Sequence, residues 1–159
     1  MELETALRFL HVLGATVLLG TGAGIAFFMV WANRTRNPAI VAHVAGTVVV
    51  ADTLFTLTAV IAQPITGYFL AAEVGWSLAE EWIALSLLLY VVTGLFWIPV
   101  VFIQIRLRNL AREAAEKNLP LPGLYHRLYR IWFVCGFPAF LAVLGILWLM
   151  IDRPLFDLF

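Results

Sequence analysis

Long apolar segments separated by short polar ones make up most of this chain. Four of them are long enough to cross a bilayer, which takes about 20 consecutive apolar residues. They cover residues 5–32, 39–69, 81–107 and 127–151. The pattern therefore predicts an all-α protein, a single integral membrane domain over residues 1–159 folded as a four-helix transmembrane bundle. Pro64, inside the second segment, is expected to bend or end that helix.

The composition agrees with a membrane protein and excludes a soluble domain. The chain is 63% hydrophobic and 13% charged, whereas soluble domains average about 45–50% apolar and about 25% charged residues. The formal net charge is zero, so nothing indicates a nucleic-acid partner, and the predicted surroundings are a lipid bilayer. The single cysteine, Cys135, excludes an intrachain disulfide, a CxxC motif and a c-type haem attachment site.

Charge is distributed unevenly between the connecting segments. Every Lys and Arg of the chain lies in or beside the first or third connection, except Arg8 and Arg153, which lie near the two termini. The second connection is acidic, with Glu73, Glu80 and Glu81. Because basic loops remain in the cytoplasm, this asymmetry predicts a multi-pass protein of the bacterial inner membrane with both termini outside.

His11 is the only ionisable residue between Leu10 and Ala32. An ionisable side chain at membrane depth is costly, so it is a functional-site hypothesis by default. Its uses include a haem ligand, a hydrogen-bonded structural residue, and proton or metal chemistry.

The helix face that carries His11 has room beside it. Gly14, Leu18 and Gly22 follow His11 on one stripe, where small residues would let a flat macrocycle lie against the helix. Close packing of a second helix would use the same residues. Arg8 is a candidate for holding an acidic group of the cofactor or an anionic substrate.

The other histidines lie at a different depth. His43 falls near the cytoplasmic end of the second span, roughly 20–25 Å from His11 along the membrane normal. His43 and His11 therefore cannot be the two axial ligands of one haem. His126 lies on the same inner side as His43, which makes these two a rival pair, whereas Met150 lies at the outer end, where a second ligand opposite His11 would be needed.

The second span carries a candidate proton relay. Asp52, Thr56 and Gln63 are spaced to share one helix face. Asp52 could relay protons, accept a hydrogen bond from a histidine N–H, or join two helices through a hydrogen bond. A polar and aromatic stripe on the third span is expected to face the bundle, and it comprises Trp82, Ser86, Thr93, Trp97 and Gln104.

Several runs resemble a family of predicted bacterial integral membrane proteins defined by domain of unknown function 2269. They are Leu-His-Val-Leu-Gly-Ala at 10–15, Ala-Asn-Arg-Thr-Arg-Asn-Pro at 32–38, Ala-Asp-Thr-Leu-Phe-Thr at 51–56, Tyr-Arg-Ile-Trp at 129–132 and Leu-Met-Ile-Asp-Arg-Pro at 149–154. This resemblance implies a membrane protein and no particular activity.

A more distant resemblance does imply chemistry. The first span and the Pro-Ile-Thr-Gly run at 64–67 are similar to HemJ-type protoporphyrinogen oxidases and copper-resistance-D-like membrane domains. The HemJ resemblance implies a b-type haem on the histidine that matches His11. It also implies a functional lysine just after the Trp that begins the third span, but here Ile83 follows Trp82. That departure weakens the expectation of protoporphyrinogen oxidation specifically.

These observations lead to one expected function and two alternatives. We expect an inner-membrane redox protein that binds haem b, with His11 on the iron, and that transfers electrons or oxidises a tetrapyrrole or another lipophilic substrate. A redox partner and a homodimer belong to this expectation. The alternatives are a proton, ion or small-molecule transporter that uses Asp52, and a structural or accessory membrane subunit without a cofactor.

Overall fold

The computed structural model describes residues 2–154, and the described part of the chain folds into helices joined by short connections. The elements are α1 (Glu2–Arg34), α2 (Pro38–Ala51), the π-helical turn η1 (Asp52–Thr56), α3 (Leu57–Val74), α4 (Glu81–Glu116) and α5 (Gly123–Asp152). Because α2, η1 and α3 are continuous, four helical segments are long and apolar enough to cross a membrane. The predicted all-α membrane bundle is therefore confirmed.

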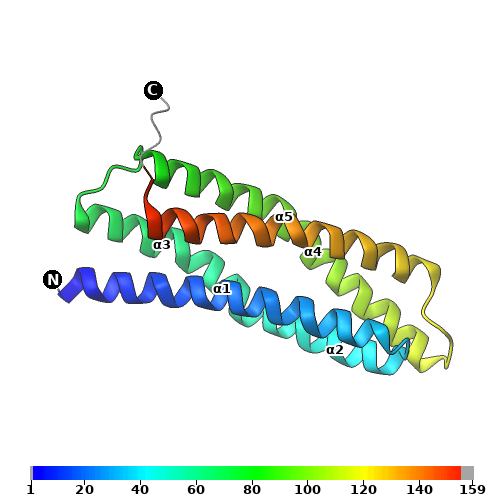
Figure 1. Cartoon of the computed structure of the whole chain (residues 1–159). Helices are drawn as coiled ribbons and strands as arrows, with labels where there is room; N and C mark the ends of the chain where they lie inside the picture. Colours follow the sequence, from blue (N-terminus) through cyan, green and yellow to red (C-terminus); the bar gives the residue numbers. More distant parts are fainter. Residues whose placement is uncertain (1, 155–159) are drawn as a thin grey trace.

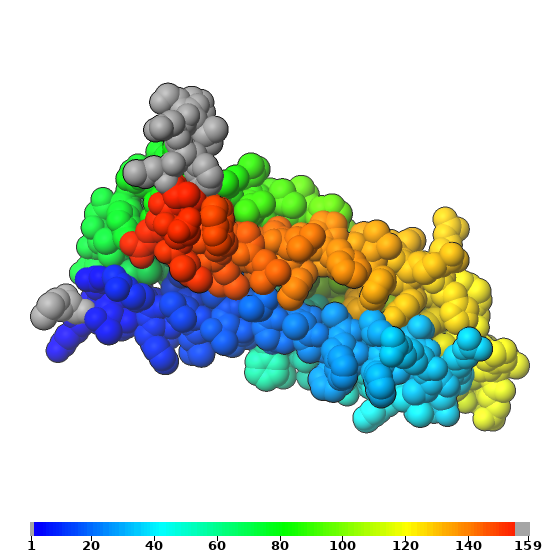
Figure 2. Space-filling model, in the orientation of Figure 1, coloured from blue at the N-terminus to red at the C-terminus, as the bar shows by residue number. Residues whose placement is uncertain are grey.

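The helical segments run up and down along an elongated molecule (Figures 1 and 2). One end carries the start of α1, the connection between α3 and α4, and the end of α5 (Figure 1). We call it the terminal end. The opposite end carries the connections after α1 and after α4, and most of the Arg residues lie in these connections or in the adjoining parts of α1, α4 and α5. We call it the basic end.

Local sequence accounts for where several helices begin and end. The Asn37 Oδ1 accepts hydrogen bonds from the backbone N–H groups of Ala39 and Ile40 at 2.9 and 3.4 Å, and Pro38 occupies the first helical position of α2. Gly75 ends α3 with a left-handed φ of 85°, a conformation that glycine adopts without a steric penalty. α4 contains the predicted span 81–107 and continues to Glu116, as the strong helix formers of the segment 111–117 predict.

Pro64 lies inside α3 and does not end it. A proline removes the N–H that would bind the carbonyl four residues earlier, which here is Val60. The Tyr90 hydroxyl of α4 donates a hydrogen bond to that carbonyl oxygen at 2.5 Å. The helix continues to Val74 because a neighbouring helix supplies the missing donor.

The packed core lies toward the basic end. α4 packs along α5, α2 packs on α4, and α1 packs on α3. The largest fully buried side chains of the core cluster are Met29, Val41, Leu107 and Tyr125. Within the described residues α3 has no comparable packing against α4 or α5. The two halves of the bundle therefore separate toward the terminal end, and the space between them contains the candidate site.

Candidate functional site

The His11 ring is held by α3. Its Nδ1 lies 2.9 Å from the Thr66 Oγ1, and the same hydroxyl lies 2.8 Å from the Ala62 carbonyl oxygen. The 2.8 Å contact assigns the single hydroxyl proton to the Ala62 carbonyl, which can only accept, and with this assignment Thr66 accepts from the His11 Nδ1–H. In this assignment His11 is the tautomer whose Nε2 has a free lone pair, which is the arrangement that metal-ligating histidines use.

Two glycines allow α1 and α3 to approach at this point. The Gln63 side chain crosses Gly14 and donates from Nε2 to the His11 carbonyl oxygen at 2.8 Å. A Cβ at position 14 would lie 2.3 Å from the Gln63 Nε2, and a Cβ at position 67 would lie 3.0 Å from the His11 Cε1. The run His-x-x-Gly on α1 and the run Gln-Pro-x-Thr-Gly on α3 therefore form one interlocking contact.

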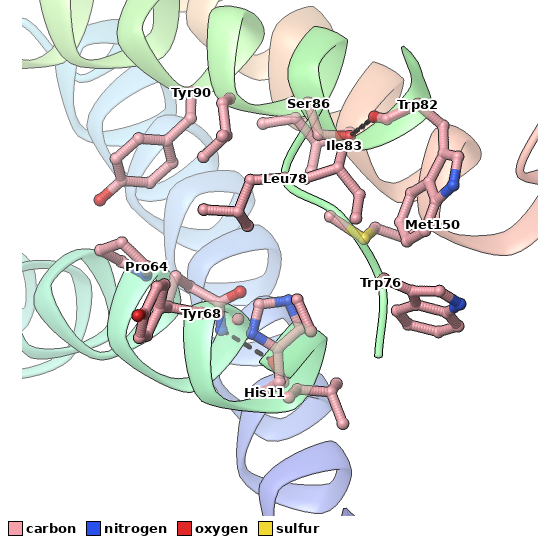
Figure 3. Close-up of a pocket in the computed structure, with 16 residues that line it drawn as sticks. His11, Pro64, Tyr68, Trp76, Leu78, Trp82, Ile83, Ser86, Tyr90 and Met150 are labelled. Carbon is pink, nitrogen blue, oxygen red and sulfur yellow. Dashed lines mark hydrogen bonds between the residues drawn. The ribbon is translucent and has the colours of Figure 1, made fainter. Parts of the chain in front are cut away.

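His11 borders a cavity of about 270 Å³ at the terminal end, between the α1–α3 pair and the α4–α5 pair. Side chains from α3, the following connection, α4 and α5 complete it (Figure 3). Most of the lining is apolar or aromatic, and its larger members include Tyr68, Trp76, Trp82, Tyr90, Ile146 and Met150. The cavity is thus lined mostly by apolar side chains, with the His11 imidazole at its border.

The face of α1 that was predicted to hold a cofactor, along Gly14, Leu18 and Gly22, does not line this cavity. Gly14 is covered by Gln63, and neither Leu18 nor Gly22 borders the His11 cavity. Arg8 is exposed and forms an ion pair with Glu4, one turn earlier on α1, at 2.5 Å. Any ligand of His11 would therefore lie against α4 and α5 rather than along the stripe of α1.

The structure also shows where the other predicted iron ligands, Met150, His43 and His126, lie. Met150 borders the same cavity as His11 and reaches it from α5 (Figure 3). His43 lines a different groove, between α1 and α2, and His126 is exposed near the start of α5. The structure therefore places Met150, and neither of the other two histidines, in the cavity of His11.

A second polar cluster lies in the core at the π-helical turn. Asp52 is buried in η1, and the Trp97 Nε1 of α4 donates to its Oδ1 at 3.3 Å. In the amide orientation that satisfies its neighbours, the Gln104 nitrogen donates to the Asp52 Oδ2 at 3.2 Å, and the Gln104 oxygen accepts from the Trp132 Nε1 at 3.1 Å. This chain of hydrogen bonds connects η1, α4 and α5.

The predicted face of Asp52, Thr56 and Gln63 is divided by this turn. Asp52 and Thr56 are buried in the core, whereas Gln63 belongs to the His11 contact. A π-helical turn contains one residue more than an α-helical turn and changes the rotation of everything that follows. Sequence periodicity describes one helix at a time, so it did not identify Thr66 as the partner of His11 on another helix or Trp132 as a member of the Asp52 cluster.

The chain was compared with known protein families, curated proteins and solved structures. The family model described as "Predicted integral membrane protein (DUF2269)" matches residues 5–154. The chain belongs to this family. The matched region of the DUF2269 protein includes the whole His11 cavity and the whole Asp52 cluster. No curated protein and no solved structure matches the chain.

Proposed function

We propose that this DUF2269 protein is a redox protein of the bacterial inner membrane that binds a b-type haem through His11. The observation that carries the proposal is the contact between the His11 Nδ1 and the Thr66 hydroxyl beside an apolar cavity. Thr66 holds the Nδ1–H, and the free Nε2 belongs to a side chain that borders an apolar cavity. Haem iron in proteins is commonly held by a histidine whose second nitrogen is hydrogen-bonded in this way.

The remaining residues of the cavity fit such a group. Trp76 and Trp82 would supply aromatic walls, and Met150 would supply a thioether, a group that can bind haem iron. Ligand sites have volumes of about 300–1,000 Å³, so a cavity of about 270 Å³ would hold one edge of the macrocycle. The other edge would extend beyond the cavity, toward lipid or a second copy of the chain in a homodimer.

The bound haem would supply one-electron redox chemistry, for electron transfer or for oxidation of a tetrapyrrole or another lipophilic substrate with a separate redox partner. The chain's residues would bind the group and orient it. His11 would hold the iron, Thr66 would keep the imidazole in the required orientation, and the apolar walls would exclude water.

An absorption titration of the purified protein tests this proposal. The wild-type chain is expected to give a Soret band that shifts when dithionite is added. His11→Ala should lose the band, and His43→Ala, a matched control in the other groove, should keep it. A wild-type protein without a Soret band in the presence of excess haem would contradict the proposal and favour a subunit without a cofactor.

The orientation in the membrane is part of the proposal. The positive-inside rule places the basic end in the cytoplasm, so the His11 cavity would lie in the outer half of the bilayer and both termini outside.

A second candidate function is movement of protons through Asp52. The observation that favours it is a carboxyl group buried in a π-helical turn within a bundle of apolar helices. Such turns are frequent at functional sites, and ionisable residues inside membranes commonly mark ion or proton pathways.

Proton flux into liposomes, followed with an internal pH dye, tests this second function. Asp52→Asn should abolish a flux that the wild-type chain supports, and Glu113→Gln, an exposed control, should not change it. Equal flux through wild-type and Asp52→Asn proteins would exclude Asp52 as the carrier.

A further inference from the structure

The guanidinium group of Arg153 is held over the two tryptophans that border the His11 cavity. Its Cζ lies 4.5 Å from the centre of the Trp76 ring and 5.7 Å from that of Trp82. The two indoles meet edge to face, with their centres 5.2 Å apart. A cation over aromatic faces is attracted by them, and this arrangement fixes its position.

The backbone at Arg153 brings the side chain to this place. Arg153 is the C-cap of α5, and its φ of 46° lies in the left-handed region that glycine usually occupies at this position. Arg153 follows Met150 by three residues, so it lies about 4.5 Å further toward the terminal end of the same helix. The order along α5 is therefore a thioether that borders the cavity and then a cation beyond it.

The hydrogen-bonding edge of this cation has no acidic partner among residues 2–154. The ion pairs of the described residues are Arg8 with Glu4 and Lys117 with Glu113. Stacking on aromatic rings uses the faces of a guanidinium and leaves its N–H groups at the edge, where a carboxylate can bind with two parallel hydrogen bonds. The arrangement is therefore suited to an anion at the membrane surface.

We infer that Arg153, positioned by Trp76 and Trp82, binds a carboxylate of the ligand that occupies the His11 cavity. The inference rests on the proposed function, in which that ligand is haem. A macrocycle that is only partly enclosed has its acidic side chains outside the cavity, and the polar surface of the membrane is where they avoid the cost of burying a charge. Arg153 replaces Arg8 in this role because the Arg8 guanidinium is already paired.

The test compares haem with its dimethyl ester, which has the same ring and iron and no carboxylate. Both are titrated into the full chain in phosphatidylcholine nanodiscs, where no anionic lipid competes, and the Soret band and tryptophan fluorescence are followed. The wild-type protein should bind haem more tightly than the ester. Arg153→Gln should weaken haem binding by about tenfold or more, as expected for loss of a charged hydrogen bond, and should leave binding of the ester unchanged.

Two further variants test whether the effect depends on the planar guanidinium of Arg153 and on that residue alone. Arg153→Lys keeps the charge but loses the planar fork, so its affinity for haem should be intermediate, and Arg8→Gln should behave as wild type. If Arg153→Gln keeps the wild-type preference for haem over the ester, the inference is wrong and the proposed function stands. If the wild-type chain binds neither compound, both are wrong.

Discussion

The Thr66 hydroxyl determines which nitrogen of His11 is free. It accepts from Nδ1–H because its own proton is directed to the Ala62 carbonyl. Thr66→Val has nearly the same shape and removes the acceptor. We expect it to weaken haem binding by about 10–100-fold, the usual effect of losing such a supporting hydrogen bond, measured by Soret titration. Thr66→Ser should retain most of the affinity, and unchanged binding by Thr66→Val would show that the tautomer is set in another way.

Gly14 and Gly22 form a matched pair for testing the contact between α1 and α3. An added Cβ at position 14 would meet the Gln63 Nε2, and one at position 22 would meet nothing within 4 Å. Gly14→Ala should lower the free energy of unfolding by about 1–3 kcal/mol, because the Gln63 amide has to move and give up its hydrogen bond to the His11 carbonyl, and Gly22→Ala should not lower it. Denaturant unfolding in detergent measures both. Equal stability of the two variants would mean that Gln63 moves aside freely.

Among single residues, the sequence indicated His11 as a candidate because a lone ionisable residue is conspicuous in an apolar span. It did not identify Thr66 or the position of Gln63. A threonine in a membrane helix ordinarily bonds to its own backbone, as Thr16, Thr47 and Thr93 do here. Whether it also meets a side chain on another helix depends on how the two helices are rotated, which composition and spacing do not specify.

The pairing of Tyr90 with the carbonyl freed by Pro64 connects α4 to α3 across the opening of the bundle. Tyr90→Phe leaves the Val60 carbonyl without a donor and should destabilise the fold by about 1–3 kcal/mol. In a Pro64→Ala background the backbone N–H of residue 64 can bind that carbonyl, so Tyr90→Phe should cost much less. A double-mutant cycle measured by unfolding gives the coupling energy, and additive effects would contradict this explanation.

The four spans could be predicted element by element because each needs little more than length and apolar composition. The stripe predicted to face the bundle is largely confirmed, with Trp82, Ser86 and Gln104 buried. The π-helical turn could not be predicted. Its residues are ordinary for a helix, and the turn coincides with the hydrogen bonds that the buried Asp52 accepts from Trp97 and Gln104 of α4.

Across the whole molecule, the packed core and the cavity lie toward opposite ends, and the proposed orientation assigns them to opposite halves of the bilayer. Cysteine labelling tests that orientation. In a Cys135→Ser background, Ser77→Cys at the terminal end should react with a membrane-impermeant maleimide in intact cells. Lys117→Cys at the basic end should react only after permeabilisation. The reverse pattern would place the His11 cavity on the cytoplasmic side.

The π-helical turn also constrains how this chain can tolerate insertions and deletions. Each residue of an α-helix advances the chain by about 100° around the axis, so deleting one residue within 52–56 would regularise the helix and rotate α3 by that angle. Gln63 and Thr66 would then face away from His11, although every residue of the contact would still be present in an alignment. The count of residues between Asp52 and Gln63 is therefore as informative about a relative as the identity of either residue.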